Sequence, residues 1–238
     1  MSLAGAGLLV GVAGRVATVT LDRPQRRNAL DHALLRRLPG VMQDLDRDPQ
    51  VDVIVLTGSD PAFCAGLDLN DFSAGAGSAA EPARAAPPAE SPVPARPWPV
   101  LGTPVIGAVN GPAVTGGLEL ALHCDILLAS ERAVFADTHA AVGIMPGWGM
   151  TVLLPALIGA QMARYMSLAG GRLSAVRAHE LGLVAEVLPH DGLLARARDL
   201  ATQMSAHQAG VVAVQRIYRH TAALVEDPQR QAEAAIRA

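Results

Sequence analysis

The sequence predicts an α/β fold in which short buried strands alternate with turns and helices. Apolar runs of strand length occur at Val53–Leu56, Val105–Val109 and Ile126–Ala129, and short continuous runs of this kind are typical of buried strands. Glycine and proline follow the first two runs closely, and helix-favouring residues come next. Half of the 238 residues are hydrophobic, which is enough for a sizeable core.

The chain begins with segments typical of a hairpin followed by a helix. Leu8–Val12 and Arg15–Leu21 flank a central Ala-Gly pair, and the second segment alternates β-branched residues with apolar ones. After the polar stretch DRPQRRNALD, either Asn28 or Asp31 can cap an amphipathic helix that runs to about Leu45.

The later part of the chain is predicted to be mainly helical. A short strand at Ala133–Phe135 precedes helices at Thr151–Ile158 and Ala160–Leu168, and a strand is expected at Leu183–Leu188. From residue 191 onward the pattern is helical, with Gly210 and Pro228 as the expected interruptions. Residues 73–99 are dense in alanine, proline, glycine and serine, so they predict a mobile loop whose end Trp98 could anchor.

Composition excludes several classes of protein. A net charge of −3 provides no basic footprint for nucleic acid, and the chain has no lysine, which excludes Schiff-base chemistry and the P-loop. Cys64 and Cys124 do not form a spaced set with histidines, so we expect no metal site. The apolar start has no basic segment and is too short to cross a bilayer, so the sequence predicts a cytoplasmic protein that does not bind membranes.

The segment Val105–Ala129, VIGAVNGPAVTGGLELALHCDILLA, is where chemistry is expected. It reads as strand, turn, short helix and strand, with Thr115 as the predicted N-cap. Gly116 and the next glycine allow another molecule to approach the unpaired amides of the helix start. Glu119 then places a carboxylate beside these amides. On these residues alone, a packing turn with an acidic first turn is an equal alternative.

Three motifs in this order resemble the enoyl-CoA hydratase/isomerase family, the crotonase superfamily. They are AFCAGLDL at 62–69, NGPAVTGGLELALHCD at 110–125 and FADTHAAVGIMPGWG at 135–149, with support from LDRPQRRNAL and GLVAEVLP. The resemblance implies a spiral of repeated ββα units over residues 1–190 and a C-terminal helical oligomerisation region over residues 191–238. It also implies a homotrimer or a dimer of trimers.

The resemblance implies an oxyanion hole formed by the backbone amides of Leu67 and Gly116, with Glu119 as the catalytic carboxylate. Such amides stabilise charge on a thioester oxygen. His139 departs from the family pattern, because well-characterised hydratases have a second glutamate there. Histidine can act as an acid or a base near neutral pH, and a polar residue that lines the pocket is an equal alternative. Thr115 stands where a third glycine is usual.

The resemblance also implies a coenzyme A site. Arginine suits phosphate geometry, so Arg26 and Arg27 are the phosphate candidates, although a solvent-exposed helix face is the alternative for at least one of them. The remaining substrate-binding candidates are the backbone groups of Ala65, Asp68 and Leu69, the pocket glycine Gly147, and Trp148, which either shapes the acyl pocket or belongs to the core.

The function implied by the resemblance is hydration of a 2-trans-enoyl-CoA without a cofactor, since coenzyme A is part of the substrate. One alternative is double-bond isomerisation or another enolate-type acyl-CoA reaction, for which Glu119 alone would suffice. A second alternative is a non-catalytic acyl-CoA binder. A dinucleotide-dependent oxidoreductase and a serine hydrolase are not supported, because neither a correctly spaced GxGxxG nor a GxSxG motif is present.

Overall fold

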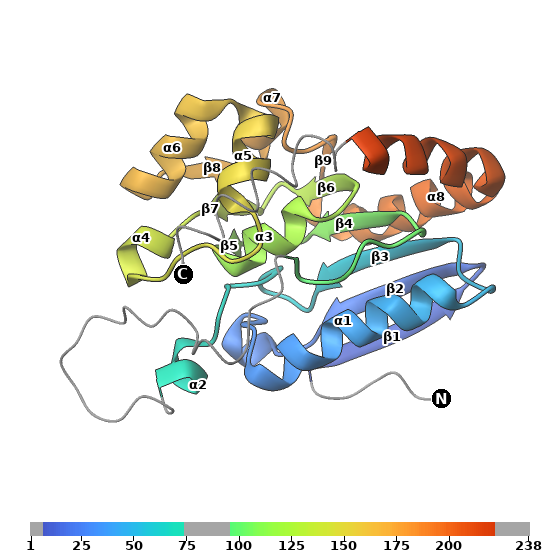
Figure 1. Ribbon diagram of the computed structural model, residues 1–238, viewed down its shortest axis with the longest axis horizontal. Helices are drawn as coiled ribbons and strands as arrows, with labels where there is room; N and C mark the ends of the chain where they lie inside the picture. The colour runs from blue at the N-terminus through green and yellow to red at the C-terminus, as the bar shows by residue number, and fades with distance from the viewer. Residues whose placement is uncertain (1–6, 74–95, 222–238) are drawn as a thin grey trace.

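The computed structural model describes residues 7–73 and 96–221, and a six-stranded sheet forms its centre (Figure 1). The first two strands are an antiparallel hairpin, and every later pair of neighbours in this sheet runs parallel. In spatial order the strands are β1 (Leu8–Ala13), β2 (Val16–Leu21), β3 (Val53–Gly58), β4 (Val105–Val109), β6 (Ile126–Ser130) and β9 (Glu186–Leu188).

A second sheet of three strands lies next to the helices that form the site. Its strands are β5 (Ala113–Val114), β7 (Val134–Ala136) and β8 (Arg172–Ser174). The helices are α1 (His32–Arg47), α2 (Leu69–Ser73), α3 (Gly116–Leu122), α4 (His139–Val142), α5 (Met150–Ile158), α6 (Ala160–Ala169), α7 (Ala175–Glu180) and α8 (Leu193–Ser205), with short 3-10 turns η1 (Pro24–Arg26) and η2 (His190–Gly192). Residues 208–221 are also helical. The predicted α/β class is confirmed.

The large sheet is covered on both faces, which explains why its central strands are continuously apolar. Along β3, Ile54 and Leu56 pack in the cluster that contains the buried side of α1. The alternate residues Val53 and Val55 pack in a second cluster with the buried side of α8. Successive side chains of a strand point to opposite faces, so one strand contributes to both layers. The predicted division after residue 190 stays a prediction.

The predicted hairpin is confirmed, and the structure decides between the two predicted caps of α1. The Asp31 carboxylate accepts the backbone N–H of Leu34 at 2.8 Å, so Asp31 is the N-cap. Asn28 instead lies before the helix with a φ of +56°. Its buried side-chain amide donates to the carbonyl oxygens of Ser59 and Ala62, which fastens the segment before α1 to the turn after β3.

Two predicted boundaries are wrong. The last helical stretch is interrupted at residues 206–207, and Gly210 lies inside the helical residues 208–221; a glycine inside a helix costs only about 1 kcal/mol relative to alanine and need not end it. The strand predicted at Leu183–Leu188 is shorter and begins at Glu186, as β9. Leu183 belongs to the turn that ends α7 instead, because its amide donates to the Ala178 carbonyl at 2.9 Å. Pro228 and most of the predicted loop at 73–99 lie outside the described residues; at the end of that loop, Trp98 is buried.

No helix in the described parts of the chain combines the length and apolar character needed to cross a membrane. The cytoplasmic location stays a prediction.

Candidate active site

Two bends from distant parts of the chain lie against each other at the start of α3. Gly66 has a φ of +90°, a conformation that residues with a side chain rarely adopt. A Cβ atom on Gly66 would lie 3.3 Å from the amide nitrogen of Gly116 and 2.9 Å from the carbonyl oxygen of Val114. The structure therefore brings together the two glycine turns that the sequence singled out.

The backbone amides of Leu67 and Gly116 lie unpaired at this contact in the described parts of the chain. Neither N–H donates a hydrogen bond within residues 7–73 and 96–221. A Cβ atom on Gly116 would lie 3.9 Å from the Leu67 nitrogen, so the two amides belong to one small region. Gly116 is the first residue of α3, where a helix leaves its amides without intrahelical partners.

Thr115 precedes α3 in a conformation usually left to glycine. Its φ is +55°, which is strained for a β-branched residue. The prediction that the Thr115 hydroxyl caps α3 is wrong, because a side-chain cap needs an extended N-cap backbone. The hydroxyl instead lies 2.5 Å from the Thr138 hydroxyl. It also accepts the Thr138 N–H at 3.3 Å. Thr115 thus ties the start of α3 to the residue before His139.

Glu119 is buried in the first turn of α3 and is held by the loop that leads into α5. Its side chain is 3% exposed. One carboxylate oxygen, Oε1, accepts the backbone N–H groups of Trp148 at 2.7 Å and Met150 at 3.3 Å. The other oxygen, Oε2, lies 3.6 Å from Nε2 of His139. The backbone therefore fixes the carboxylate in place while Oε2 faces the imidazole.

His139 begins α4 and lies between two carboxylates. Its Nδ1 is 2.7 Å from Oδ1 of Asp137, and its Nε2 faces Glu119. All three side chains are nearly inaccessible to solvent, with 6% exposure for His139, 3% for Glu119 and 0% for Asp137. Since buried charges are stable only when paired, His139 is the group placed to pair with both buried carboxylates.

The two carboxylates differ in basicity. Burial raises the pKa of Glu119 above its ordinary value, and His139 with the surrounding backbone N–H groups only partly opposes this effect. Burial also raises the pKa of Asp137, but hydrogen bonding to His139 and the nearby Ser167 hydroxyl outweighs burial and lowers it. Glu119 is therefore the carboxylate more able to accept a proton near neutral pH.

A second histidine–carboxylate pair lies outside this region. His190 Nε2 is 3.0 Å from Oδ2 of Asp60, and its Nδ1 is 3.1 Å from the Ser130 hydroxyl. The set resembles a hydrolase triad in residue type only, because Ser130 is fully buried and cannot reach a substrate. The described residues also contain no group of three or more His, Cys, Asp or Glu side chains arranged to hold a metal ion.

A family model described as Enoyl-CoA hydratase/isomerase matches residues 11–237. The chain belongs to the enoyl-CoA hydratase/isomerase family. It is 39% identical over 200 residues to a protein of Arabidopsis thaliana named "Probable enoyl-CoA hydratase 1, peroxisomal", across 84% of this chain and 72% of that one. The "2,3-dehydroadipyl-CoA hydratase" of Escherichia coli is 38% identical, across 84% and 76%. A crystal structure of an enoyl-CoA hydratase from Mycobacterium smegmatis matches with a TM-score of 0.86 and 45% identity, across 98% and 97%.

Membership of the enoyl-CoA hydratase/isomerase family confirms the predicted crotonase-like fold and makes an acyl-CoA thioester a fitting substrate. The segments expected to hold coenzyme A are adjacent. The Ala65 amide donates to the Arg27 carbonyl and the Asp68 amide to the Leu30 carbonyl, both at 3.0 Å. These two N–H groups are therefore engaged within the protein. The Ala65 carbonyl accepts no hydrogen bond in the described parts of the chain, so it is one backbone group of this segment that could bind a ligand.

The arginines of this family member divide into exposed and paired ones. Arg26 and Arg27 are both exposed, and Arg26 lies near enough to Asp68 to help lower the pKa of that carboxyl. Arg23, which the sequence analysis did not single out, lies 2.9 Å from Oδ2 of Asp68. The Asp68 carboxylate thus forms an ion pair with Arg23. Leu69 begins α2 and is 47% exposed.

Gly147 and Trp148 contact Glu119 through their backbone, which the sequence did not suggest. Both lie in the loop whose backbone N–H groups surround the Glu119 carboxylate. The Trp148 side chain is buried, and its carbonyl oxygen lies 2.7 Å from Nε2 of His123. Sequence reasoning also did not assign a role to Asp137. Its position two residues before His139, at the end of β7, is the signal that could have found it.

Proposed function

We propose that this protein adds water across the double bond of a 2-trans-enoyl-CoA. The observation that carries this proposal is the 3.6 Å approach of Glu119 Oε2 to His139 Nε2, next to the available amides of Leu67 and Gly116. Hydration requires one group that takes a proton from water and another that supplies a proton to carbon. A buried carboxylate that can take a proton and a buried imidazole that can supply one meet both requirements.

In the proposed reaction, the Glu119 carboxylate takes a proton from water while the water oxygen bonds to C3. The π electrons of the C2–C3 bond shift towards C2 and the thioester, and the Leu67 and Gly116 amides stabilise the charge on the thioester oxygen. The His139 imidazolium then gives its Nε2 proton to C2. A proton that passes from Glu119 to His139 restores the starting state. Every atom of the product comes from the thioester and water, so we propose that no cofactor takes part.

We place coenzyme A along the edge where the segments around residues 26–27 and 65–69 meet. Arg26 and Arg27 are exposed cations there and would contact the phosphates, for which guanidinium groups provide matching donors. The Ala65 carbonyl is free to accept a hydrogen bond from the adenine amino group, and the exposed Leu69 and the backbone of Asp68 would border the pantetheine arm. Gly147 and Trp148 would border the acyl group.

The direct test is the loss of conjugated-thioester absorbance when the protein is mixed with crotonyl-CoA and with longer enoyl-CoA esters. We expect turnover by the wild type and a fall in kcat of about 10²-fold or more for His139→Ala. The matched control is His207→Ala, because His207 is exposed in the turn after α8 and should leave kcat unchanged. Full hydration by His139→Ala would refute the assigned role of the imidazole.

The same preparations separate hydration from the two alternatives. A 3-enoyl-CoA is offered in parallel, and conversion to the conjugated ester without hydration would identify an isomerase, for which Glu119 alone suffices. Tight binding of acyl-CoA without turnover of either ester would identify a binder. Either result would replace the proposed hydratase function.

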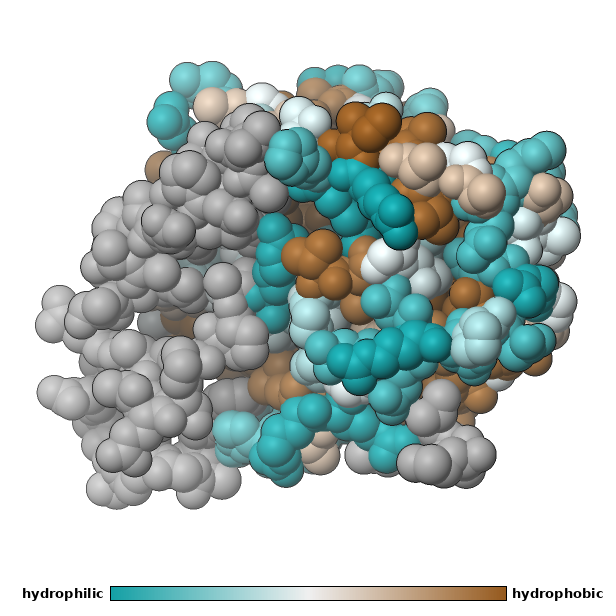
Figure 2. Space-filling view, turned by 45° about the vertical axis from the view of Figure 1, so that its right-hand side comes forward, coloured by the Kyte–Doolittle hydropathy of each residue, from teal (hydrophilic) through white to brown (hydrophobic). Residues whose placement is uncertain are grey.

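We also propose that the chain assembles as a homotrimer or a dimer of trimers. Large apolar side chains are exposed in the helical residues 208–221, where Val214, Ile217 and Tyr218 are 52%, 67% and 72% exposed. Figure 2 shows that apolar surface also lies between polar regions on one face of the molecule. Exposed apolar surface of this kind favours association. Light scattering coupled to gel filtration should give three or six times the mass of one chain, 24.6 kDa; a monomer would contradict this proposal.

A further inference from the structure

Asp137 makes the contacts of a group that orients the imidazole. It follows β7 directly, and its Oδ1 accepts both the backbone N–H of His139 at 3.0 Å and, at 2.7 Å, the Nδ1 of the same residue. Within the described residues, His139 is its ion-pair partner and no arginine pairs with it. Two hydrogen bonds to one oxygen set both the position and the rotation of the ring.

The burial of Asp137 determines which imidazole nitrogen carries a proton. Its side chain is 0% exposed, and leaving a charged carboxylate unpaired at such a position is strongly unfavourable. Because an ionised carboxylate can only accept hydrogen bonds, Nδ1 must hold the proton that lies between His139 and Asp137. Nε2 is then the nitrogen that gains and loses a proton opposite Glu119.

We propose that Asp137 is a positioning residue that holds His139 in the Nδ1-protonated form, with Nε2 presented to Glu119 and the substrate. The proposal rests on the hydratase function proposed above, in which His139 supplies the proton to C2. In this proposal, an imidazole held by a carboxylate is the proton donor at the position of the second glutamate of the family pattern. Asp137 itself does not touch the substrate.

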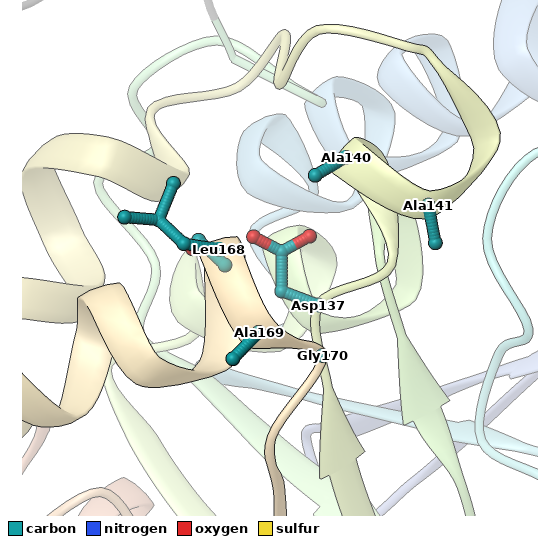
Figure 3. A pocket seen from close by; sticks show the side chains of 7 residues that line it. Asp137, Ala140, Ala141, Leu168, Ala169 and Gly170 are labelled. Atoms are coloured by element: carbon teal, nitrogen blue, oxygen red, sulfur yellow. The ribbon is translucent and has the colours of Figure 1, made fainter.

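A cavity on the other side of Asp137 makes this proposal testable by chemical rescue. The cavity has a volume of about 250 Å³ and is lined by Asp137, Ala140 and Ala141 of α4 and by residues 167–170 at the end of α6. Figure 3 shows the Asp137 carboxylate between α4 and Leu168. Its second oxygen, Oδ2, is buried and accepts no hydrogen bond of normal geometry from the described residues, although the Ser167 hydroxyl lies close enough to help lower the Asp137 pKa. A small carboxylate that entered this space could replace the missing group in a truncated variant.

Two carboxylates are the charged groups next to the His139 imidazole in the described parts of the chain. Glu119 of α3 and Asp137 after β7 are its charged neighbours in the described parts of the chain, and α6 contributes the uncharged Ser167 beside Asp137. Removing the Asp137 charge therefore removes one of the two anions that stabilise the imidazolium.

The first experiment measures hydration kinetics of Asp137→Asn and Asp137→Ala in the full-length protein. We expect kcat to fall about 10²-fold while KM for crotonyl-CoA stays within about threefold. Formate should restore part of the kcat of Asp137→Ala but not that of Asp137→Asn, in which the side chain still fills the site. Asp60→Asn is the matched control, because it alters the other histidine–aspartate pair and should leave kcat unchanged. Wild-type kcat in Asp137→Asn, or loss of activity in Asp137→Ala that tracks loss of folding and resists formate, would overturn the proposal.

The second experiment does not depend on turnover. Nitrogen NMR of histidine-labelled wild-type protein should show Nδ1-protonated His139, assigned by its loss in His139→Gln. The Nδ1 proton signal should disappear in Asp137→Ala and persist in Asp60→Asn. If the wild type hydrates no ester, the hydratase proposal fails while this measurement still decides the tautomer. An Nδ1 without a proton in the wild type would overturn the positioning role by itself.

Discussion

Glu119→Gln is expected to lower kcat for enoyl-CoA hydration by about 10²–10⁴-fold. Glutamine preserves the shape of the side chain and can still accept the backbone N–H groups of Trp148 and Met150, which lie 2.7 Å and 3.3 Å from Oε1 in the wild type. It cannot take a proton from water, and its amide would place donor hydrogens opposite His139. Burial raises the pKa of the native carboxyl, so the substitution removes a stronger base than an exposed glutamate would be.

Steady-state kinetics with crotonyl-CoA and isothermal titration with a non-reactive acyl-CoA test this expectation together. Binding should be nearly unchanged, because in the proposed mechanism the carboxylate takes part in the chemistry and not in holding coenzyme A. Glu180→Gln is the matched control: Glu180 is 52% exposed and pairs with Arg177 on the surface of α7, so it should retain wild-type kcat. Substantial turnover in Glu119→Gln would remove Glu119 from the role of base.

Gly66→Ala is expected to lower kcat by about 10²–10³-fold by disrupting the proposed oxyanion hole. The new Cβ would lie 2.9 Å from the Val114 carbonyl oxygen and 3.3 Å from the Gly116 amide nitrogen. Both are backbone atoms, so relief requires the two bends to separate. A φ of +90° adds strain for any residue with a side chain. In the proposed mechanism, the Leu67 and Gly116 amides could then no longer donate to the same thioester oxygen.

Gly159→Ala is the control that separates geometry from stability. Gly159 has a similar φ of +79°, but a Cβ there would meet nothing within 4 Å. Both variants should lose thermal stability, and only Gly66→Ala should lose most of its kcat. Calorimetry and kinetics on the same samples measure the two effects. Equal activity in the two variants would show that the contact between the bends does not support catalysis.

Much of the fold could be predicted because its signals are local. The hairpin, the apolar runs of β3, β4 and β6, and the capped start of α1 each follow from periodicity and turn chemistry within a few residues. The wrong boundaries also have local causes: Gly210 does not end its helix, and Leu183 is taken up by the end of α7.

The candidate site could be predicted only in part. The resemblance identified Leu67, Gly116, Glu119 and His139, and the structure places the first two at one contact and the last two 3.6 Å apart. The pairing of Arg23 with Asp68 was not predicted, because the two residues are distant in sequence and meet only through the packing of the turn before α1 against the bend after Gly66.

The sequence by itself determined the α/β class, the family, and the residue types at the two glycine turns, because each depends on residues that are neighbours along the chain. Only the tertiary structure decided that His139 lies between Glu119 and Asp137 and that backbone amides before α5 hold one Glu119 oxygen. The reason is that these contacts join α3 to α4 and to the loop before α5, which are distant from α3 along the chain. Only the packing of these elements buries the three side chains together.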